Sequence, residues 1–314
     1  MSDLNQSTAF THLQRSLMKD GIRYQQTDPE SRYFGAIIPP GSGIDNSHAT
    51  AYFVTRCGAA LTGFFRGHAL VDGLTPDLLI ERMRMGLDSL VRFQRPSGLI
   101  DLRSANYDSA PDTAFVVQAL GLIVYFDTTV TPDPPYATGW NSVVEQVRKF
   151  IRSTVPGIVE GGFHTPNHRW VISSALSLAS AVIPELRTPE LEATVEAYLA
   201  EGFDDDSEGA FIERCAGAYD MITTRALLIL AATWKRDIKD QVYSSVRRNL
   251  EFNAHLLHYD GTIETGLSRR QDYGVRKKAA GLIPSYLELA AATGAGAFRT
   301  VAEYIWRQCD PADA

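Results

Sequence analysis

Two kinds of apolar segment alternate along the chain. In the first kind the residues are apolar on almost every side of a helix, which is typical of helices buried on all sides. None contains the roughly 18 to 20 uninterrupted apolar residues of a membrane span, because each carries a polar residue or a glycine. We therefore expect buried helices and no membrane partner. Five segments are of this kind: residues 51–65, 113–126, 170–183, 222–234 and 279–292.

The second kind of segment is apolar on one face only. Between residues 140 and 151, Trp140, Val144, Val147 and Ile151 recur at helical spacing, with charged residues between them. The segment after Thr75 and the segments near residues 191–199 and 238–257 repeat this pattern. Because the two kinds alternate, the sequence predicts an inner layer of buried helices and an outer layer of amphipathic ones.

A short loop pattern recurs before the predicted inner helices: a glycine, then an apolar residue, then a polar or acidic one. A spacing of about 50 residues between such loops indicates a repeat of helical hairpins. The sequence therefore predicts an all-α fold, an incomplete (α/α) toroid of about five to six helical hairpins. The alternative is an open helical solenoid that serves as a binding scaffold. The five loops begin at Gly43, Gly98, Gly162, Gly209 and Gly261.

The repeat accounts for the whole length of the chain. The protein has 314 residues, of which 45% are hydrophobic, enough for one large core or two smaller ones. Since the hairpins leave no segment for a second domain, we expect a single domain over residues 1–314. Residues 1–44 form an N-terminal helix and a lead-in loop in this interpretation, and residues 45–309 form the hairpin repeats.

Charge and cysteine content narrow the function. A formal net charge of −7 argues against a nucleic-acid partner, which calls for a basic surface. Cys57, Cys215 and Cys309 are far apart and odd in number, so they indicate neither a disulfide framework nor a paired-cysteine metal site. The first residues lack the pattern of a signal peptide, which leads us to expect a cytoplasmic protein.

The loops that enter the inner helices are longer than a connector requires and are rich in reactive side chains. They gather imidazole, phenol and guanidinium groups, and guanidinium groups bind carboxylates well. We therefore expect these loops to bind an anionic ligand. Tyr107 and Trp170 add aromatic faces on which a flat ring stacks. The candidate substrate-binding residues are Arg169, Arg214, Arg225, Arg270, His164, Tyr107 and Trp170.

One set of loop residues resembles a known enzyme family. The pair Asn167-His168 opens a predicted inner helix, and Tyr219 opens the next, 51 residues after His168. This arrangement resembles the heparinase II/III-like polysaccharide lyases over roughly residues 45–295. The resemblance implies an α/α toroid followed by a β-sandwich, and β-elimination on uronic-acid polysaccharides, with an anionic oligo- or polysaccharide as substrate. Because the chain has no sandwich segment, it also implies a missing C-terminal β-sandwich domain as a partner.

The chemistry of β-elimination gives the three residues distinct expected roles. Asn167 and His168 would neutralise the uronate carboxylate and stabilise the enolate-like transition state. Tyr219 would remove the proton and return it to the leaving oxygen, with Arg214 or Arg225 as its cationic neighbour. Arg169 or Arg270 would hold a second carboxylate.

A different chemistry remains open. Asp108, Asp112 and Glu213 lie on the same set of loops and could act as acid and base in a glycoside hydrolase, similar to the unsaturated glucuronyl hydrolases. Structural roles are also open: Asn167 as a helix N-cap, and Asp112 as a charge at a helix N-terminus. A third alternative is a non-catalytic helical domain that binds glycan or packs against a partner domain.

We expect no cofactor and no metal. The acidic run at residues 204–206 lacks the spacing of a calcium-binding EF-hand loop. Phosphate-binding and dinucleotide-binding glycine motifs are also absent from the sequence.

Overall fold

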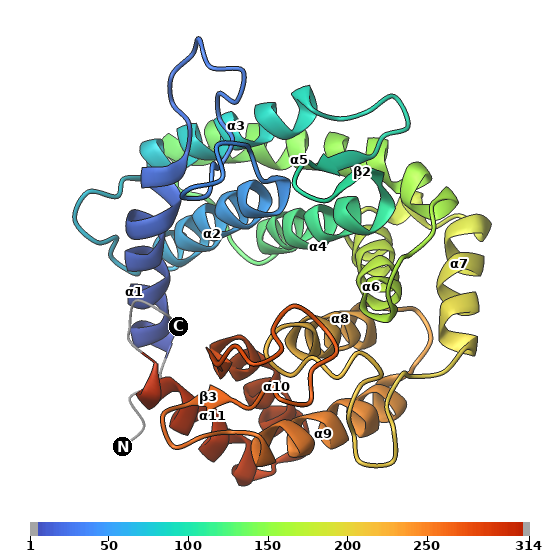
Figure 1. Cartoon of the computed structure of the whole chain (residues 1–314). Coiled ribbons are helices and arrows are strands. Elements are labelled where there is room, and N and C mark those ends of the chain that lie inside the picture. Colours follow the sequence, from blue (N-terminus) through green and yellow to red (C-terminus); the bar gives the residue numbers. More distant parts are fainter. Residues whose placement is uncertain (1–5, 310–314) are drawn as a thin grey trace. The chain divides into compact units, whose positions relative to one another are not determined.

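The computed structural model describes residues 6–309, and nearly all of its regular structure in that range is helical (Figure 1). This confirms the all-α fold class, whereas the toroidal arrangement stays a prediction. The two small sheets are antiparallel pairs, β1 (Ile100–Leu102) with β2 (Asn106–Ser109) and β3 (Thr262–Ile263) with β4 (Lys277–Lys278). The α-helices are α1 (Gln6–Ser16), α2 (Ser47–Phe65), α3 (Pro76–Arg92), α4 (Ala110–Asp127), α5 (Pro134–Glu160), α6 (Pro166–Val182), α7 (Pro189–Ala200), α8 (Tyr219–Thr233), α9 (Lys239–His255), α10 (Ile283–Thr293) and α11 (Gly296–Gln308).

The chain divides into two compact units. The described residues of unit 1 are 164–177 and 193–309, and unit 2 comprises residues 6–163 and 178–192. The expectation of one domain over residues 1–314 stays a prediction.

In unit 2 the buried and amphipathic helices occupy the two layers that their sequences predict. Helix α2 packs against both α3 and α4, while α4 also packs against α5, and α3 packs against α5 (Figure 1). Almost every residue of α4 between Ala110 and Gly121 is buried, which fits a helix that is apolar on all sides. The side chains of Asn46, Thr75 and Ser109 accept hydrogen bonds from backbone N–H groups in the first turns of α2, α3 and α4.

Unit 1 repeats the scheme with shorter helices. Helix α8 packs against α9 and α10, and α10 packs against α9 and α11. The apolar segment 279–292 is not one helix: residues 279–282 form a 3-10 turn, and α10 begins at Ile283 with Pro284 in its first turn.

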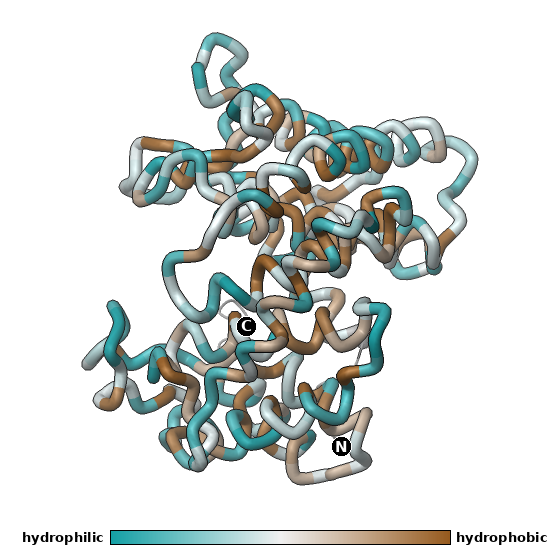
Figure 2. Tube along the Cα trace, turned by 90° about the vertical axis from the view of Figure 1, so that its right-hand side faces the viewer, coloured by the Kyte–Doolittle hydropathy of each residue, from teal (hydrophilic) through white to brown (hydrophobic). Residues whose placement is uncertain are grey.

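Figure 2 shows hydrophobic residues along the helices, whereas the projecting loops are mostly hydrophilic. Within residues 6–309, no helix combines the length and the apolar content that crossing a bilayer demands.

The repeated loop glycines have a packing role. Gly98 has φ +86°, and a Cβ there would lie 2.1 Å from the carbonyl oxygen of Ser153 in α5. Gly209 has φ +90°, and a Cβ there would lie 2.3 Å from the carbonyl oxygen of Arg248 in α9. A Cβ at Gly261 would lie 2.5 Å from Cβ of Gln308 in α11. Each of these loops therefore presses a glycine against an outer helix, at a position where only glycine fits.

The same packing identifies one glycine that the sequence pattern missed and two that it overinterpreted. Gly35, with φ +85°, contacts the backbone of Met85 in α3 in the same manner, whereas Gly43 has no neighbour within 4 Å of a Cβ. Gly162 also has open space around it. The loops that begin at Gly98, Gly209 and Gly261 therefore share a loop–helix contact, whereas the first and third loops lack it.

Candidate functional site

A buried carboxylate and a buried amide form the centre of a polar cluster in unit 1. Asn167 and Glu213 are 1% and 7% exposed. In the amide orientation that pairs every donor with an acceptor, the side chain of Asn167 donates to Oε1 and Oε2 of Glu213 at 3.1 and 3.0 Å. The backbone N–H of Asn167 also donates to Oε2, at 3.2 Å. The first turn of α6 therefore holds Glu213 at three points.

Asn167 is not a helix N-cap. It is the second residue of α6, and its side-chain nitrogen also lies 2.6 Å from Oγ1 of Thr165. Both amide hydrogens thus have protein acceptors.

The environment of Glu213 changes its acidity. Burial raises the pKa of Glu213 to about 7, although the charge of Arg270 and the backbone N–H of Asn167 act in the opposite direction. Nη1 of Arg270 lies 3.9 Å from Oε1 of Glu213, too far for a direct hydrogen bond. A carboxyl group with a pKa near neutrality is able to give or take a proton under physiological conditions.

Arg270 connects Glu213 to Tyr219. Its guanidinium carbon lies 4.9 Å from the centre of the Tyr219 ring, within the range of a cation–π interaction. The hydroxyl of Tyr219 donates to Oε1 of Gln271 at 3.1 Å. Arg270 is therefore a cation beside Tyr219, whereas the sequence suggested Arg214 or Arg225 for this position.

Two histidines, His164 and His168, are close to Asn167 along the chain. His168 is the third residue of α6, and its ring meets that of the exposed His164 edge to face, with centroids 6.0 Å apart. His168 is partly buried, so both rings are able to contribute to a surface next to the first turn of α6.

The structure gives Arg169 and Trp170 a structural role instead of the expected contact with substrate. Arg169 is 3% exposed, pairs with Glu201, and donates from Nη2 to Asp204 at 2.7 Å and to the Gly202 carbonyl at 2.8 Å. Trp170 is 1% exposed and donates from Nε1 to the same carboxylate of Asp204 at 3.1 Å. Because both side chains are buried, neither is available to a sugar or its carboxylate.

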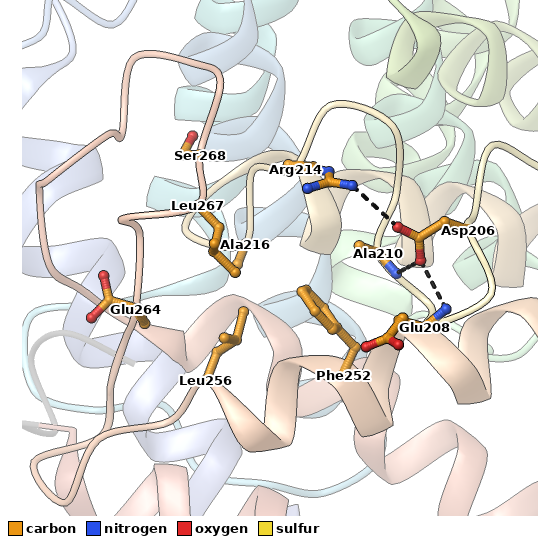
Figure 3. Close-up of a pocket in the computed structure, with 10 residues that line it drawn as sticks. All are labelled: Asp206, Glu208, Ala210, Arg214, Ala216, Phe252, Leu256, Glu264, Leu267 and Ser268. Atoms are coloured by element: carbon orange, nitrogen blue, oxygen red, sulfur yellow. Dashed lines mark hydrogen bonds and ion pairs between the residues drawn. The ribbon is translucent and has the colours of Figure 1, made fainter.

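Arg214 lines a pocket of unit 1 (Figure 3). It directly follows Glu213, has φ +48°, and its Nη2 lies 3.6 Å from Oδ2 of Asp206. Figure 3 shows the Arg214 side chain directed toward Asp206, with the ring of Phe252 on the opposite side of the pocket. The volume is about 290 Å³. The lining residues are Asp206, Glu208, Ala210, Arg214, Ala216, Phe252, Leu256, Glu264, Leu267 and Ser268.

The pocket and the Glu213 cluster share two chain segments. Ser268 lines the pocket two residues before Arg270 and hydrogen bonds to Asp272, which also accepts from Sγ of Cys215 at 3.1 Å and from the Gly217 N–H at 3.0 Å. These bonds join residues 213–219 to residues 264–272. The loop that carries Arg270 is thereby fixed against the loop that carries Glu213.

The remaining predicted binding residues are Arg225 and Tyr107. Arg225 is exposed on α8, nearly two turns from Tyr219. Tyr107 belongs to unit 2, where it is 62% exposed and donates to the Arg103 carbonyl at 3.3 Å.

Asp108 and Asp112, two carboxylates of the hydrolase alternative, differ in their burial. Asp108 is exposed, has φ +48°, and accepts a hydrogen bond from Ser97. Asp112 is 2% exposed and accepts from Oγ of Ser109 at 2.6 Å and from Nδ2 of Asn106 at 2.8 Å. The two carboxylates therefore have separate partners.

Asp112 also contacts a histidine that the sequence analysis missed. Nε2 of His48, in the first turn of α2, lies 3.1 Å from Oδ1 of Asp112. Burial by itself would raise the pKa of Asp112, but the hydrogen bonds from His48, Ser109 and Asn106 outweigh it and lower the pKa below its ordinary value. Asp112 is thus held ionised and cannot act as a general acid at neutral pH. A lone histidine before an apolar segment offers no sequence signal of this contact.

Among residues 6–309, no group of three or more histidine, cysteine or acidic side chains is arranged to hold a metal ion. The acidic run includes Asp204 and Asp205, which are instead bound by Arg169 and Arg248.

Comparisons with known proteins give a likeness in structure. No family model matches the sequence, and no curated protein matches it. A solved structure of a polysaccharide lyase, BACCELL_00875, is similar to the chain with a TM-score of 0.45 and 11% sequence identity. The similarity covers 95% of this chain and 45% of the lyase chain, so the protein spans less than half the length of that lyase.

Proposed function

We propose that the protein is a carbohydrate-active lyase that cleaves uronic-acid glycans by β-elimination, with Tyr219 as the proton-transferring residue. The observation that carries this proposal is the contact between the Tyr219 ring and Arg270, 4.9 Å apart, beside a carboxyl group whose pKa is about 7. Together these groups offer a phenol, a fixed cation and a titratable acid in one cluster.

Tyr219 supplies the base and then the acid. The phenolate oxygen takes the proton from C5 of the uronate, the C5 electron pair forms the C4–C5 double bond, and the C4–O bond breaks. The phenol then returns a proton to the leaving oxygen. The Arg270 guanidinium stabilises negative charge on the phenolate during this exchange.

Glu213 takes part in neutralising the substrate carboxylate. Because both amide hydrogens of Asn167 already have acceptors, Asn167 acts by holding Glu213, and a protonated Glu213 donates to the uronate carboxylate. Arg270 adds a positive charge, and His168 extends the surface from the next position on α6. Preorganised donors of this kind stabilise the enolate-like transition state.

A glycoside hydrolase is the second candidate, because a buried carboxyl with a pKa of about 7 is also what a general acid for glycosidic cleavage requires. Glu213 would protonate the glycosidic oxygen in that reaction. The two carboxylates whose charge acts on Glu213 are Asp220 and Asp204, and both are already hydrogen-bonded within unit 1. This leaves the hydrolase without an evident second carboxylate and favours the lyase.

The products separate the two reactions. A lyase forms an unsaturated uronate that absorbs in the ultraviolet, whereas a hydrolase forms reducing ends without a new double bond. We expect ultraviolet-absorbing product from a panel of uronic-acid glycans, and loss of that product in Tyr219→Phe but not in the control Tyr259→Phe, which alters an 87% exposed tyrosine. Full activity of Tyr219→Phe would contradict the lyase mechanism, and reducing ends alone would favour the hydrolase. Binding without any turnover would indicate a non-catalytic domain.

A further inference from the structure

Unit 2 contains a cavity that the proposed reaction does not use. Its volume is about 360 Å³, within the range of small-molecule binding sites. It lies between the segment that follows α1, the loop near Pro39 and one face of α2. Aromatic rings from Tyr24 and Tyr52 line it, together with one carboxylate, Asp20, and one guanidinium, Arg56.

The wall of the cavity is formed by an unusual helical turn. Residues Leu17–Ile22 are a π-helix, a rare conformation that occurs frequently at functional sites. Gly21 in this turn packs so closely on α2 that a Cβ would lie 2.4 Å from Cδ2 of Phe53. The glycine thus brings the backbone next to Asp20 against α2.

One face of α2 presents polar groups at helical spacing. His48, Tyr52 and Arg56 are four residues apart and therefore lie on the same side of the helix. Nε2 of His48 faces Asp112 at 3.1 Å, and its ring lies 4.8 Å from that of Phe115, so the imidazole is held in place by α4. Arg56 has a weak partner, Oγ of Ser16 at 3.5 Å.

The two charged side chains of the cavity do not form an ion pair with each other. Across the described part of the chain, neither Asp20 nor Arg56 belongs to an ion pair, although both line the same cavity. A carboxylate accepts hydrogen bonds and a guanidinium donates them, so the pair suits a ligand that has hydroxyl groups able to do both. Tyrosine rings provide the apolar surface for the flat face of such a ligand.

We propose that this cavity is a carbohydrate-binding site, separate in its residues from the Tyr219 cluster, that takes one pyranose ring of a glycan. The ring stacks on Tyr24 or Tyr52, Asp20 accepts from its hydroxyl groups, and Arg56 donates to them. The site holds substrate and performs no bond cleavage, so it does not depend on the reaction proposed for Tyr219.

Titration calorimetry and amide chemical shifts with cellobiose, maltose and D-glucuronate test this assignment on the full chain. We expect at least one sugar to bind and to shift amides near Gly21 and Tyr52. The variants Asp20→Asn and Tyr52→Ala should each weaken binding about ten-fold, as expected for a lost charge-assisted hydrogen bond or a lost stacking surface. The matched controls Asp72→Asn and Tyr125→Ala alter exposed residues of unit 2 outside the cavity and should bind as the natural chain does.

Asp20→Asn keeps the shape of the side chain, so its result is informative even if Tyr52→Ala unfolds. Absence of binding by all three sugars, or binding that Asp20→Asn and Tyr52→Ala leave unchanged, would overturn the assignment. Tyr219→Phe should bind sugar normally at this site. Loss of turnover with intact binding, or binding without any turnover, therefore separates this site from the proposed lyase reaction.

Discussion

The guanidinium of Arg270 lies over the ring of Tyr219, with 4.9 Å between its central carbon and the ring centre. The same guanidinium faces Glu213, 3.9 Å away. One arginine thus links the phenol and the titratable carboxyl of the candidate site. Its removal is the most direct test of whether the cluster works as a unit.

Replacing Arg270 by methionine should lower turnover about 100-fold, the scale of losing one preorganised charge at a developing anion. The neighbouring Arg269→Met is the control, because Arg269 is exposed. Initial rates of ultraviolet-absorbing product measure both. Equal losses in the two variants would mean that Arg270 acts only through general surface charge.

Replacing Glu213 by glutamine should stabilise the protein at high pH. Burial raises the pKa of Glu213 to about 7 from 4.5, so the folded state binds a proton that the unfolded state releases between these values. The native chain therefore loses up to about 3 kcal/mol as pH rises from 4.5 to 7, and Glu213→Gln does not.

Urea unfolding at pH 4.5 and pH 8 measures this difference. The free energies of unfolding of the natural chain and Glu213→Gln should nearly agree at the lower pH and diverge at about pH 8. Glu208→Gln, which changes an exposed carboxylate, should show no such divergence. A gap that stays constant with pH would refute the assignment of the raised pKa to Glu213.

Gly98→Ala should destabilise the protein far more than Gly67→Ala. Both glycines have nearly the same positive φ, +86° and +88°, so the backbone strain of the two substitutions is alike, about 1 kcal/mol. Only at residue 98 does the new methyl group meet a backbone oxygen, that of Ser153, at 2.1 Å. Thermal unfolding of the two variants isolates the packing contribution of the loop glycine, and equal melting temperatures would count against it.

Arg169→Met should cost about 3 kcal/mol of stability, because it leaves the carboxylates of Glu201 and Asp204 without their buried partner. Arg214→Met is the comparison, since Arg214 is 44% exposed and lies 3.6 Å from its one ion-pair partner, Asp206. It should change stability by less than about 1 kcal/mol. If urea unfolding showed comparable losses of unfolding free energy in the two variants, the structural role of Arg169 would be contradicted.

The helices were predictable because the signal for them is local. The spacing of Trp140, Val144 and Val147 places a helix correctly, and α5 contains it. The ends of this helix were harder to predict. Helix α5 runs from Pro134 to Glu160, so it includes residues 152–160, where Pro156 interrupts the apolar pattern. Pattern recognition finds the buried face, whereas the ends depend on neighbouring elements.

The candidate site was predictable only in part. Asn167, Tyr219 and Arg270 were all named from their loops, as was Glu213, but the sequence assigned Glu213 to a different reaction from Asn167. Their contact spans 46 residues, and no spacing rule links an amide to one particular carboxylate at that distance. The contact of His48 with Asp112 was missed for the same reason.

The sequence by itself determined the all-α fold and the position of the reactive loops, because hydrophobic periodicity and glycine-bearing loops act within one or two turns of chain. The tertiary structure decided which side chains meet. In the folded chain Arg169 and Trp170 are buried, Asn167 contacts Glu213, and Arg270 lies over the ring of Tyr219. Burial and charge pairing between distant segments set the acidity of a carboxyl group, and these depend on packing that no local pattern encodes.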